Sequence, residues 1–152
     1  MTLQSYLDRM GVSYQLSFHT PVFSAQELAE KEHVPGDNVI KPVIVQADGR
    51  FIMCALPATT KVDLRRLADV LHAMHLRLAG EQELADLFPD CQLGAEPPIG
   101  FLYGMPTWID GSLMADDRVT FQAGTHEAAV TLTMEEYKRI AQPEIGAFAM
   151  HC

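Results

Sequence analysis

The stretch VIKPVIVQADGRFIMCALPA, residues 39–58, decides the fold. A β-branched run precedes the tetrapeptide ADGR at 47–50 and a second apolar run follows it. Its Asp48-Gly49 pair is typical of hairpin turns because such residues accept positive φ angles. Segments 38–46 and 51–56 are therefore predicted to be paired antiparallel strands. So clear a hairpin favours an α+β fold with a mixed or antiparallel sheet over a doubly wound parallel sheet.

The remaining elements follow from periodicity and from capping residues on either side of this hairpin. Helices are expected at 2–10, at 24–34, from Thr60 and Asp63 to about 71, at 80–88, and from 133 to about 141. Further strands are expected at 13–19, 107–110, 118–124 and 128–133. No repeat, low-complexity tract or long linker interrupts the chain, so residues 1–152 are predicted to form one compact α+β domain. Its sheet is mixed or antiparallel, or a partial barrel, and helices flank it.

Composition and charge limit the function. The chain has 11 Lys and Arg against 20 Asp and Glu, a net charge of −9, which argues against a broad basic face and against a DNA partner. Any contact with nucleic acid must be small and local. No apolar run approaches the ~20 residues of a membrane span, and the first residues lack the pattern of a signal peptide. We therefore expect no membrane contact and a cytoplasmic location.

The cysteines do not suggest a framework or a nucleophile. Three of them, Cys54, Cys91 and Cys152, stand far apart in the sequence, which fits a reducing compartment. Cys54 is expected to pack as a small apolar group in a strand. Cys91 has no basic neighbour in the sequence that would lower its pKa. The chain also contains no GxSxG, GxGxxG or P-loop motif, so no cofactor is predicted.

Lys41 is the first candidate for chemistry. It stands in VIKPVIV, where both faces of the predicted strand are apolar, and an unpaired buried charge would cost several kcal/mol. Pro42 holds Lys41 extended and removes a ladder donor, which predicts a bulge or a sheet edge there. Two interpretations stay open: the ammonium group points into a cleft and binds a phosphate or polarises an ester, or it extends past the strand end into solvent.

The segment GAEPPIGFLYGMP, residues 94–106, is the second candidate. Gly94 and Gly100 allow close backbone approach, whereas Pro97 and Pro98 fix φ and remove N–H groups. The amides of Ala95 and Glu96 could then be held rigidly toward one point, as in an oxyanion site. The alternative is a stiff connector packed against the core.

His126 is the third candidate, exposed by a turn at Gly124 and Thr125 in front of a strand. It could bond a substrate or relay a proton, or it could simply be solvated. His72 and His75 stand three residues apart without a third ligand at a sensible spacing, so no metal site is predicted.

Four segments together resemble one family. HTPVFSAQELA (19–29), the lysine hairpin (39–58), the glycine–proline loop (94–106) and FQAGTHEAAVTL (121–132) occur in the order seen in the YbaK/ProX family of aminoacyl-tRNA deacylases. That family includes the editing domain of bacterial prolyl-tRNA synthetases and its free-standing relatives. The resemblance implies a compact α+β fold and trans-editing, the hydrolysis of the ester that joins a wrong amino acid to tRNA.

The resemblance also implies roles for particular residues. The family's strand lysine falls on Lys41, its GxxxP loop on residues 94–98 and its histidine on His126. Water attacks the ester directly with help from a ribose hydroxyl, without a protein nucleophile or a metal, while the lysine anchors the 3′ end of the tRNA. The loop Gly94, Ala95, Glu96, Pro97 and Pro98, together with Gly124 and Thr125, is expected to bind the substrate.

Two questions stay open. The family often has a hydroxyl residue after the lysine, whereas this chain has Pro42, which puts the accepted amino acid in doubt; alanine on tRNA(Pro) is the first expectation. An aminoacyl-tRNA synthetase is a candidate partner. The alternatives from other classes are a binding module that holds an aminoacyl or small-molecule ligand without turnover, and a metal-dependent hydrolase.

Overall fold

The predicted hairpin forms the centre of the molecule. In the computed structural model, which describes residues 2–152, β2 (Ile40–Ala47) and β3 (Arg50–Pro57) pair antiparallel, with Val43 opposite Cys54. The turn between them has positive φ at both Asp48 and Gly49, 48° and 85°. The sequence prediction for this hairpin is confirmed.

The other elements follow in chain order. They are α1 (Leu3–Met10), β1 (Gln15–Phe18), α2 (Ala25–Glu32), β4 (Thr60–Val62), α3 (Leu64–Leu71), β5 (Leu76–Leu78), α4 (Glu81–Leu87), β6 (Thr107–Asp110), β7 (Arg118–Gln122), β8 (Ala128–Thr133), α5 (Met134–Ala141), β9 (Glu144–Gly146) and β10 (Ala149–His151). Three short 3₁₀ helices, η1 (Gly36–Asn38), η2 (Gly100–Tyr103) and η3 (Gly111–Ala115), complete the list.

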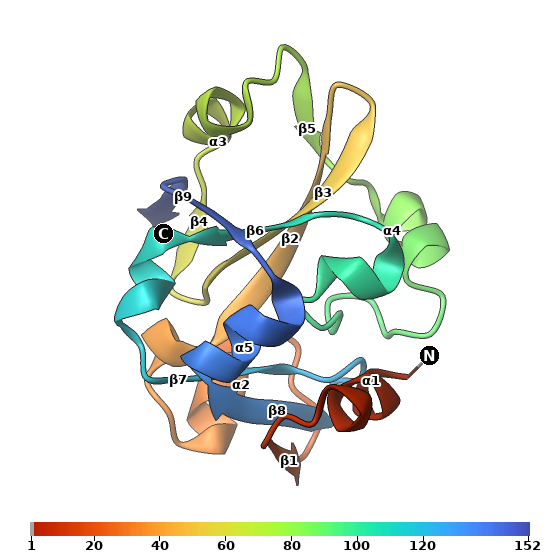
Figure 1. Cartoon of the computed structure of the whole chain (residues 1–152), viewed down its shortest axis with the longest axis vertical. Helices are drawn as coiled ribbons and strands as arrows, with labels where there is room; N and C mark the ends of the chain where they lie inside the picture. The colour runs from red at the N-terminus through yellow and green to blue at the C-terminus, as the bar shows by residue number, and fades with distance from the viewer. Residues whose placement is uncertain (1) are drawn as a thin grey trace.

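The strands form a mixed sheet and two antiparallel ones. The largest sheet has the order β5-β2-β3-β6-β9, in which β6 runs parallel to β3 and to β9. A three-stranded sheet has the order β1-β8-β7, and β10 pairs with β4. Within residues 2–152 all three sheets are open, with helices around them (Figure 1), so the α+β class is confirmed and the sheets do not close into a barrel.

The two larger sheets meet at the beginning of β2. Val39 forms a parallel bridge to Thr120 of β7, and Val39 itself is fully buried. Helix α2 covers this junction, since Leu28 and Ala29 pack with Val39 and with Ala129 of β8 in one apolar cluster. The junction therefore brings the first residues of β2, the N-terminus of α2 and the end of β7 close together.

Pro42 lies where β2 has no partner on one side. Strand β5 pairs only with residues 45–47 of β2, so no strand pairs with Pro42 on that side. The expected sheet edge is confirmed, and the register with β3 continues through Pro42 without a bulge.

Some boundaries differ from the prediction. Thr60 does not open a helix: residues Thr60–Val62 form β4, and α3 begins after Asp63, whose carboxylate accepts from the Arg66 N–H. Strands β4 and β10 have three residues each. They pair with one another although they are far apart in the sequence. Such short strands are stabilised by a distant partner rather than by their own sequence pattern. Over residues 2–152 no helix has the length and apolar character to cross a membrane.

Candidate active site

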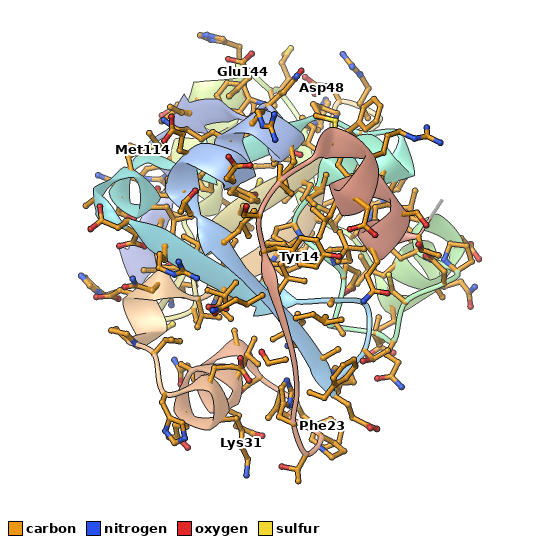
Figure 2. The ribbon with its side chains drawn as sticks, turned by 60° about the horizontal axis from the view of Figure 1, so that its bottom comes forward. Tyr14, Phe23, Lys31, Asp48, Met114 and Glu144 are labelled. Carbon is orange, nitrogen blue, oxygen red and sulfur yellow. The ribbon has the colours of Figure 1, made fainter. Side chains whose placement is uncertain are left out.

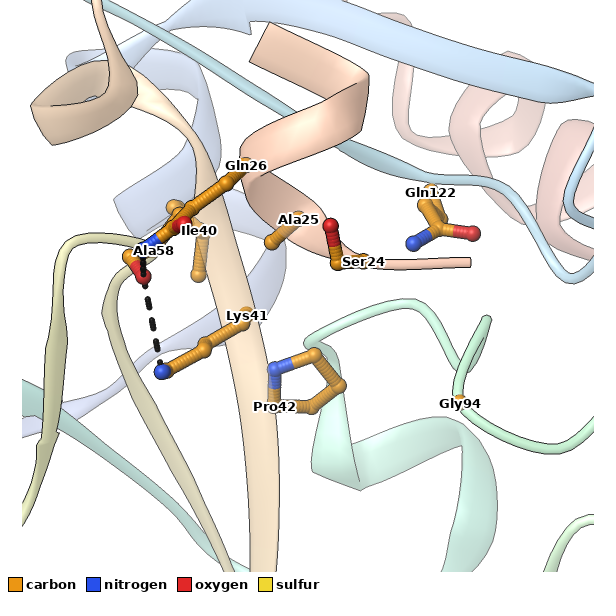
Figure 3. A pocket seen from close by; sticks show the side chains of 9 residues that line it. All are labelled: Ser24, Ala25, Gln26, Ile40, Lys41, Pro42, Ala58, Gly94 and Gln122. Carbon is orange, nitrogen blue, oxygen red and sulfur yellow. Dashed lines mark hydrogen bonds between the residues drawn. The ribbon is translucent and has the colours of Figure 1, made fainter. Parts of the chain in front are cut away.

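A cavity of about 330 Å³ opens at the junction of the two larger sheets. Figure 3 shows that its walls come from β2, from the N-terminus of α2, from the loop after α4 and from the end of β7. Nine residues line it: Ser24, Ala25, Gln26, Ile40, Lys41, Pro42, Ala58, Gly94 and Gln122. This volume is near the lower end of the range for ligand sites, so the cavity suits a small chemical group of a ligand.

Lys41 carries the only charged side chain among the nine residues that line this cavity. Its neighbour Ile40, which also lines the cavity, is 2% exposed and packs in the apolar core. The Lys41 Nζ lies 3.5 Å from the Ala58 carbonyl oxygen, at the outer limit of a hydrogen bond. The ammonium group is therefore partly buried in a cavity with only one weak acceptor, and it is available to an anionic or strongly polar ligand.

The N-terminus of α2 forms the wall of the cavity opposite the loop that contains Gly94. Ser24 caps this helix, since its side-chain oxygen accepts from the Glu27 N–H at 3.0 Å. The Gln26 amide reaches the same Ala58 oxygen as Lys41, also at 3.5 Å. Ser24 supplies the only side-chain hydroxyl in the lining, and no carboxylate or imidazole lines the cavity to deprotonate it.

Two loops are joined behind the cavity by backbone and side-chain hydrogen bonds. The Gln92 N–H donates to the Gly124 carbonyl, and the Gly124 N–H donates to the Ala95 carbonyl, both at 2.8 Å. The His126 N–H donates to Gln92 Oε1 at 2.7 Å, and His126 Nε2 lies 2.8 Å from the Leu93 carbonyl oxygen. Residues 92–95 are thus fixed against residues 124–126.

Gly94 is the point at which this fixed loop reaches the cavity. Its φ is +88°, in the left-handed region that favours glycine. A Cβ atom at this position would lie 3.6 Å from His126 Cε1. The backbone conformation therefore favours glycine at position 94, and the space beside it is bounded by the His126 ring.

His126 is not the solvated turn residue that the sequence left open. The side chain is partly buried, and its ring packs against Phe23 at a tilt of 42°, with the ring centroids 5.3 Å apart. Its Nδ1 faces Gln122 Oε1 at 3.2 Å. Phe23 is 76% exposed (Figure 2), and it directly precedes Ser24, which lines the cavity.

The fold and site can be compared with known proteins. The family model of the aminoacyl-tRNA editing domain matches residues 19–140. The chain belongs to the aminoacyl-tRNA editing domain family.

Two curated relatives cover nearly the whole editing domain. The multifunctional Ser/Thr-tRNA deacylase ProXp-y of Escherichia coli (strain K12) is 26% identical over 151 residues, 96% of this chain and 90% of that protein. The prolyl-tRNA editing protein ProX of Acetoanaerobium sticklandii is 24% identical over 148 residues, 93% of this chain and 90% of that protein. A crystal structure described as a proposed trans-editing enzyme for prolyl-tRNA synthetase has a TM-score of 0.87 at 18% identity, covering 97% and 94% of the two chains.

The editing domain brings only some of the predicted residues into the cavity. Lys41 and Gly94 line it, whereas Gly124 and His126 support the loop from behind. Thr125 is exposed, and its hydroxyl oxygen accepts from the Glu127 N–H. The substrate-binding roles expected for this set stay predictions.

Residues 95–98 are buried in the editing domain. The Ala95 N–H donates to the Gln92 carbonyl at 3.0 Å, so it does not point at a substrate as the sequence suggested. The Glu96 carboxylate accepts from the Gly94 N–H at 3.1 Å, and the Pro98 carbonyl accepts from the Tyr137 hydroxyl at 2.7 Å. The segment after Gly94 is an anchor that fixes the position of Gly94.

Two cysteines of the editing domain, Cys54 and Cys91, are poor nucleophiles. Burial raises the pKa of Cys54 to about 12. Burial is also the main reason that the pKa of Cys91 is raised to about 11, although its bond with Tyr103 opposes the shift. Among residues 2–152 no group of three or more His, Cys, Asp or Glu side chains is placed to hold a metal ion.

Three polar residues line the cavity although the sequence did not predict this position for them: Ser24, Gln26 and Gln122. Of these, Gln122 left the clearest signal. It is a long polar side chain in the predicted strand segment VTFQA, four residues before His126, and it is 7% exposed.

Proposed function

We propose that this editing domain hydrolyses the ester of mischarged aminoacyl-tRNA that carries a small amino acid, acting in trans on the 3′ end of the tRNA. One observation carries the proposal: a cavity of about 330 Å³ holds a single charge, Lys41, opposite a loop glycine that hydrogen bonds fix in place. The membership of the editing family supports the reaction class.

The composition of the cavity favours water as the nucleophile. Ser24 Oγ already caps α2, and the lining contains no group that could act as its general base. Cys54 and Cys91 keep their protons near neutral pH because their pKa values are raised to about 12 and about 11. The rate then comes from positioning the ester and from electrostatic stabilisation of the charge that develops on it.

Lys41 and Phe23 divide the binding of the tRNA end between them. The Lys41 ammonium group binds the negatively charged or polar groups of the terminal nucleotide inside the cavity. The exposed face of Phe23, beside the cavity, offers a surface on which an unpaired base stacks, an interaction worth ~1–3 kcal/mol. A chain of net charge −9 needs such a local mode of binding.

Alanine on tRNA(Pro) is the first substrate that we expect, and the name of the E. coli relative, a Ser/Thr-tRNA deacylase, adds seryl and threonyl esters. The test follows the release of radiolabelled amino acid from purified alanyl-, seryl-, threonyl-, cysteinyl- and prolyl-tRNA, with and without EDTA. We expect hydrolysis of at least one small aminoacyl ester at a rate that the chelator does not change. Binding without release across the panel would instead support a binding module, and a chelator-sensitive rate restored by zinc would support a metal-dependent hydrolase.

A further inference from the structure

Gln122 places a polar side chain in the wall of the cavity. It ends β7 and is 7% exposed, yet it is one of the residues that line the cavity. Figure 3 shows its amide nitrogen turned toward Ser24 and its oxygen turned away. A buried amide needs partners for both its oxygen and its nitrogen, because an unsatisfied buried polar group is costly.

The oxygen of this amide has its partner in His126. Because the Leu93 carbonyl can only accept, His126 Nε2 carries a proton and donates to it at 2.8 Å. His126 Nδ1 lies 3.2 Å from Gln122 Oε1, so the amide oxygen faces the ring. The ring is also held by Phe23, at 5.3 Å between centroids. His126 thus fixes Gln122 so that its NH₂ group faces the cavity.

Two loop amides near the cavity are already engaged. The Ala95 N–H donates to Gln92, and the Gly94 N–H donates to the Glu96 carboxylate. Of the two amides that the sequence suggested for an oxyanion site, that of Ala95 is therefore bound within the loop. The NH₂ group of Gln122 has two hydrogens and stands in the same cavity as Lys41.

We propose that the Gln122 NH₂ group donates to the carbonyl oxygen of the aminoacyl ester, and that His126 is the positioning residue that aims it. This inference rests on the proposed function. The water oxygen forms a bond to the carbonyl carbon, and the carbonyl π electrons move to the oxygen that Gln122 binds. When the carbonyl reforms, the ester C–O bond breaks, and the proton released by the water ends on the ribose oxygen. Gln122 contributes most when the negative charge is on the carbonyl oxygen.

Substitution of Gln122 tests this role. Gln122→Met removes the donor at similar volume, and Gln122→Glu keeps the shape but presents only acceptors when ionised. Loss of one oxyanion donor costs roughly 10²–10³-fold in kcat, so we expect a fall of that order in both variants with KM changed less than about threefold. The matched control is Gln46→Met, on β2 and outside the cavity lining, which should leave kcat unchanged.

His126→Ala tests the positioning role. We expect a fall in kcat of roughly 10- to 100-fold. The double variant with Gln122→Met should be no slower than Gln122→Met alone, because both changes act on the same hydrogen-bond donor. Independent, multiplicative losses would overturn the positioning role. Thermal melting of each variant separates loss of fold from loss of chemistry.

The outcomes separate the two proposals. If the wild-type chain releases at least one amino acid and Gln122→Met keeps a wild-type kcat, the inference is wrong while the editing function stands. The same holds if Gln122→Glu stays active, because the cavity would then need an acceptor at this position. If the wild-type chain hydrolyses no ester in the panel, the proposed function itself fails.

Discussion

At the scale of single residues, Lys41 is the charge on which the candidate site depends. The ammonium group makes a long hydrogen bond to the Ala58 carbonyl, so removing it leaves no strong partner unsatisfied. Lys41→Ala should therefore lower kcat/KM at least about 100-fold while the melting temperature changes little. Deacylation assays and thermal melts check this, with the exposed Lys61→Ala on β4 as control. Near-normal turnover in Lys41→Ala would mean that Lys41 has no part in the reaction.

Gly94 allows a second test with a well-matched control. Gly94→Ala places a side chain at φ +88°, against the His126 ring, and should lower the rate or change the preferred amino acid. Gly11 has φ +68°, and a Cβ added there would have nothing within 4 Å, so Gly11→Ala carries a similar backbone strain of about 1 kcal/mol far from the cavity. Both variants should lose a similar amount of stability, and only Gly94→Ala should alter deacylation. If Gly94→Ala and the wild type had equal activity per folded molecule, residue 94 would belong to a structural connector and not to the binding site.

The cysteines give a chemical test of the mechanism. Because the pKa of Cys91 is raised to about 11, its thiol reacts slowly with iodoacetamide at pH 7.5. Treatment should alkylate the exposed Cys152 and leave deacylation unchanged. Mass spectrometry locates the modification, and Cys91→Ala serves as the control. Loss of activity in step with Cys91 modification would contradict attack by water.

At the scale of elements, helix α5 holds the glycine–proline loop. The Tyr137 hydroxyl is buried and donates to the Pro98 carbonyl at 2.7 Å, and burial raises the pKa of Tyr137, so it stays a donor at any working pH. Tyr137→Phe leaves that carbonyl without its partner and should cost about 2 kcal/mol of unfolding free energy. Urea denaturation measures this. Tyr14→Phe, which loses only an exposed bond to Asp8, should cost roughly 0.5 kcal/mol or less.

The elements also show what could be predicted from the sequence. The β2–β3 hairpin follows from a local turn, Asp48-Gly49, between two apolar runs, and α1, α2 and α5 follow from caps that lie next to them. Strands β4, β9 and β10 could not be predicted, because each has three residues and depends on a distant partner.

The same distinction applies to the candidate site. Lys41 and Gly94 could be found because a charge in an apolar strand and a glycine before two prolines stand out locally. Gln122 could not be assigned, because its significance comes from the ring of His126 and from a cavity built by segments that are distant in the sequence. The hydrogen bond that engages the Ala95 amide is likewise a product of the folded loop.

At the scale of the whole molecule, the charge distribution predicts an unusual dependence on salt for a protein that binds tRNA. The chain has a net charge of −9, and Lys41 is the only charged residue in the lining of the cavity. About one phosphate is therefore neutralised on binding. For single-stranded nucleic acid the slope of log K against log salt is about −0.7 per phosphate, so the affinity should fall only about threefold between 50 and 200 mM NaCl. Stacking on Phe23 and burial of the aminoacyl group supply the rest of the affinity, and neither depends on counterion release.

Measurement of KM for the preferred aminoacyl-tRNA across that salt range checks this prediction. Phe23→Ala should weaken binding by ~1–3 kcal/mol without changing the slope, whereas Lys41→Ala should bring the slope close to zero. A fall in affinity of 10³-fold or more over the same range would indicate 6–10 phosphate contacts on a broad face. That result would contradict local recognition of the 3′ end, because the body of the tRNA would then be bound as well.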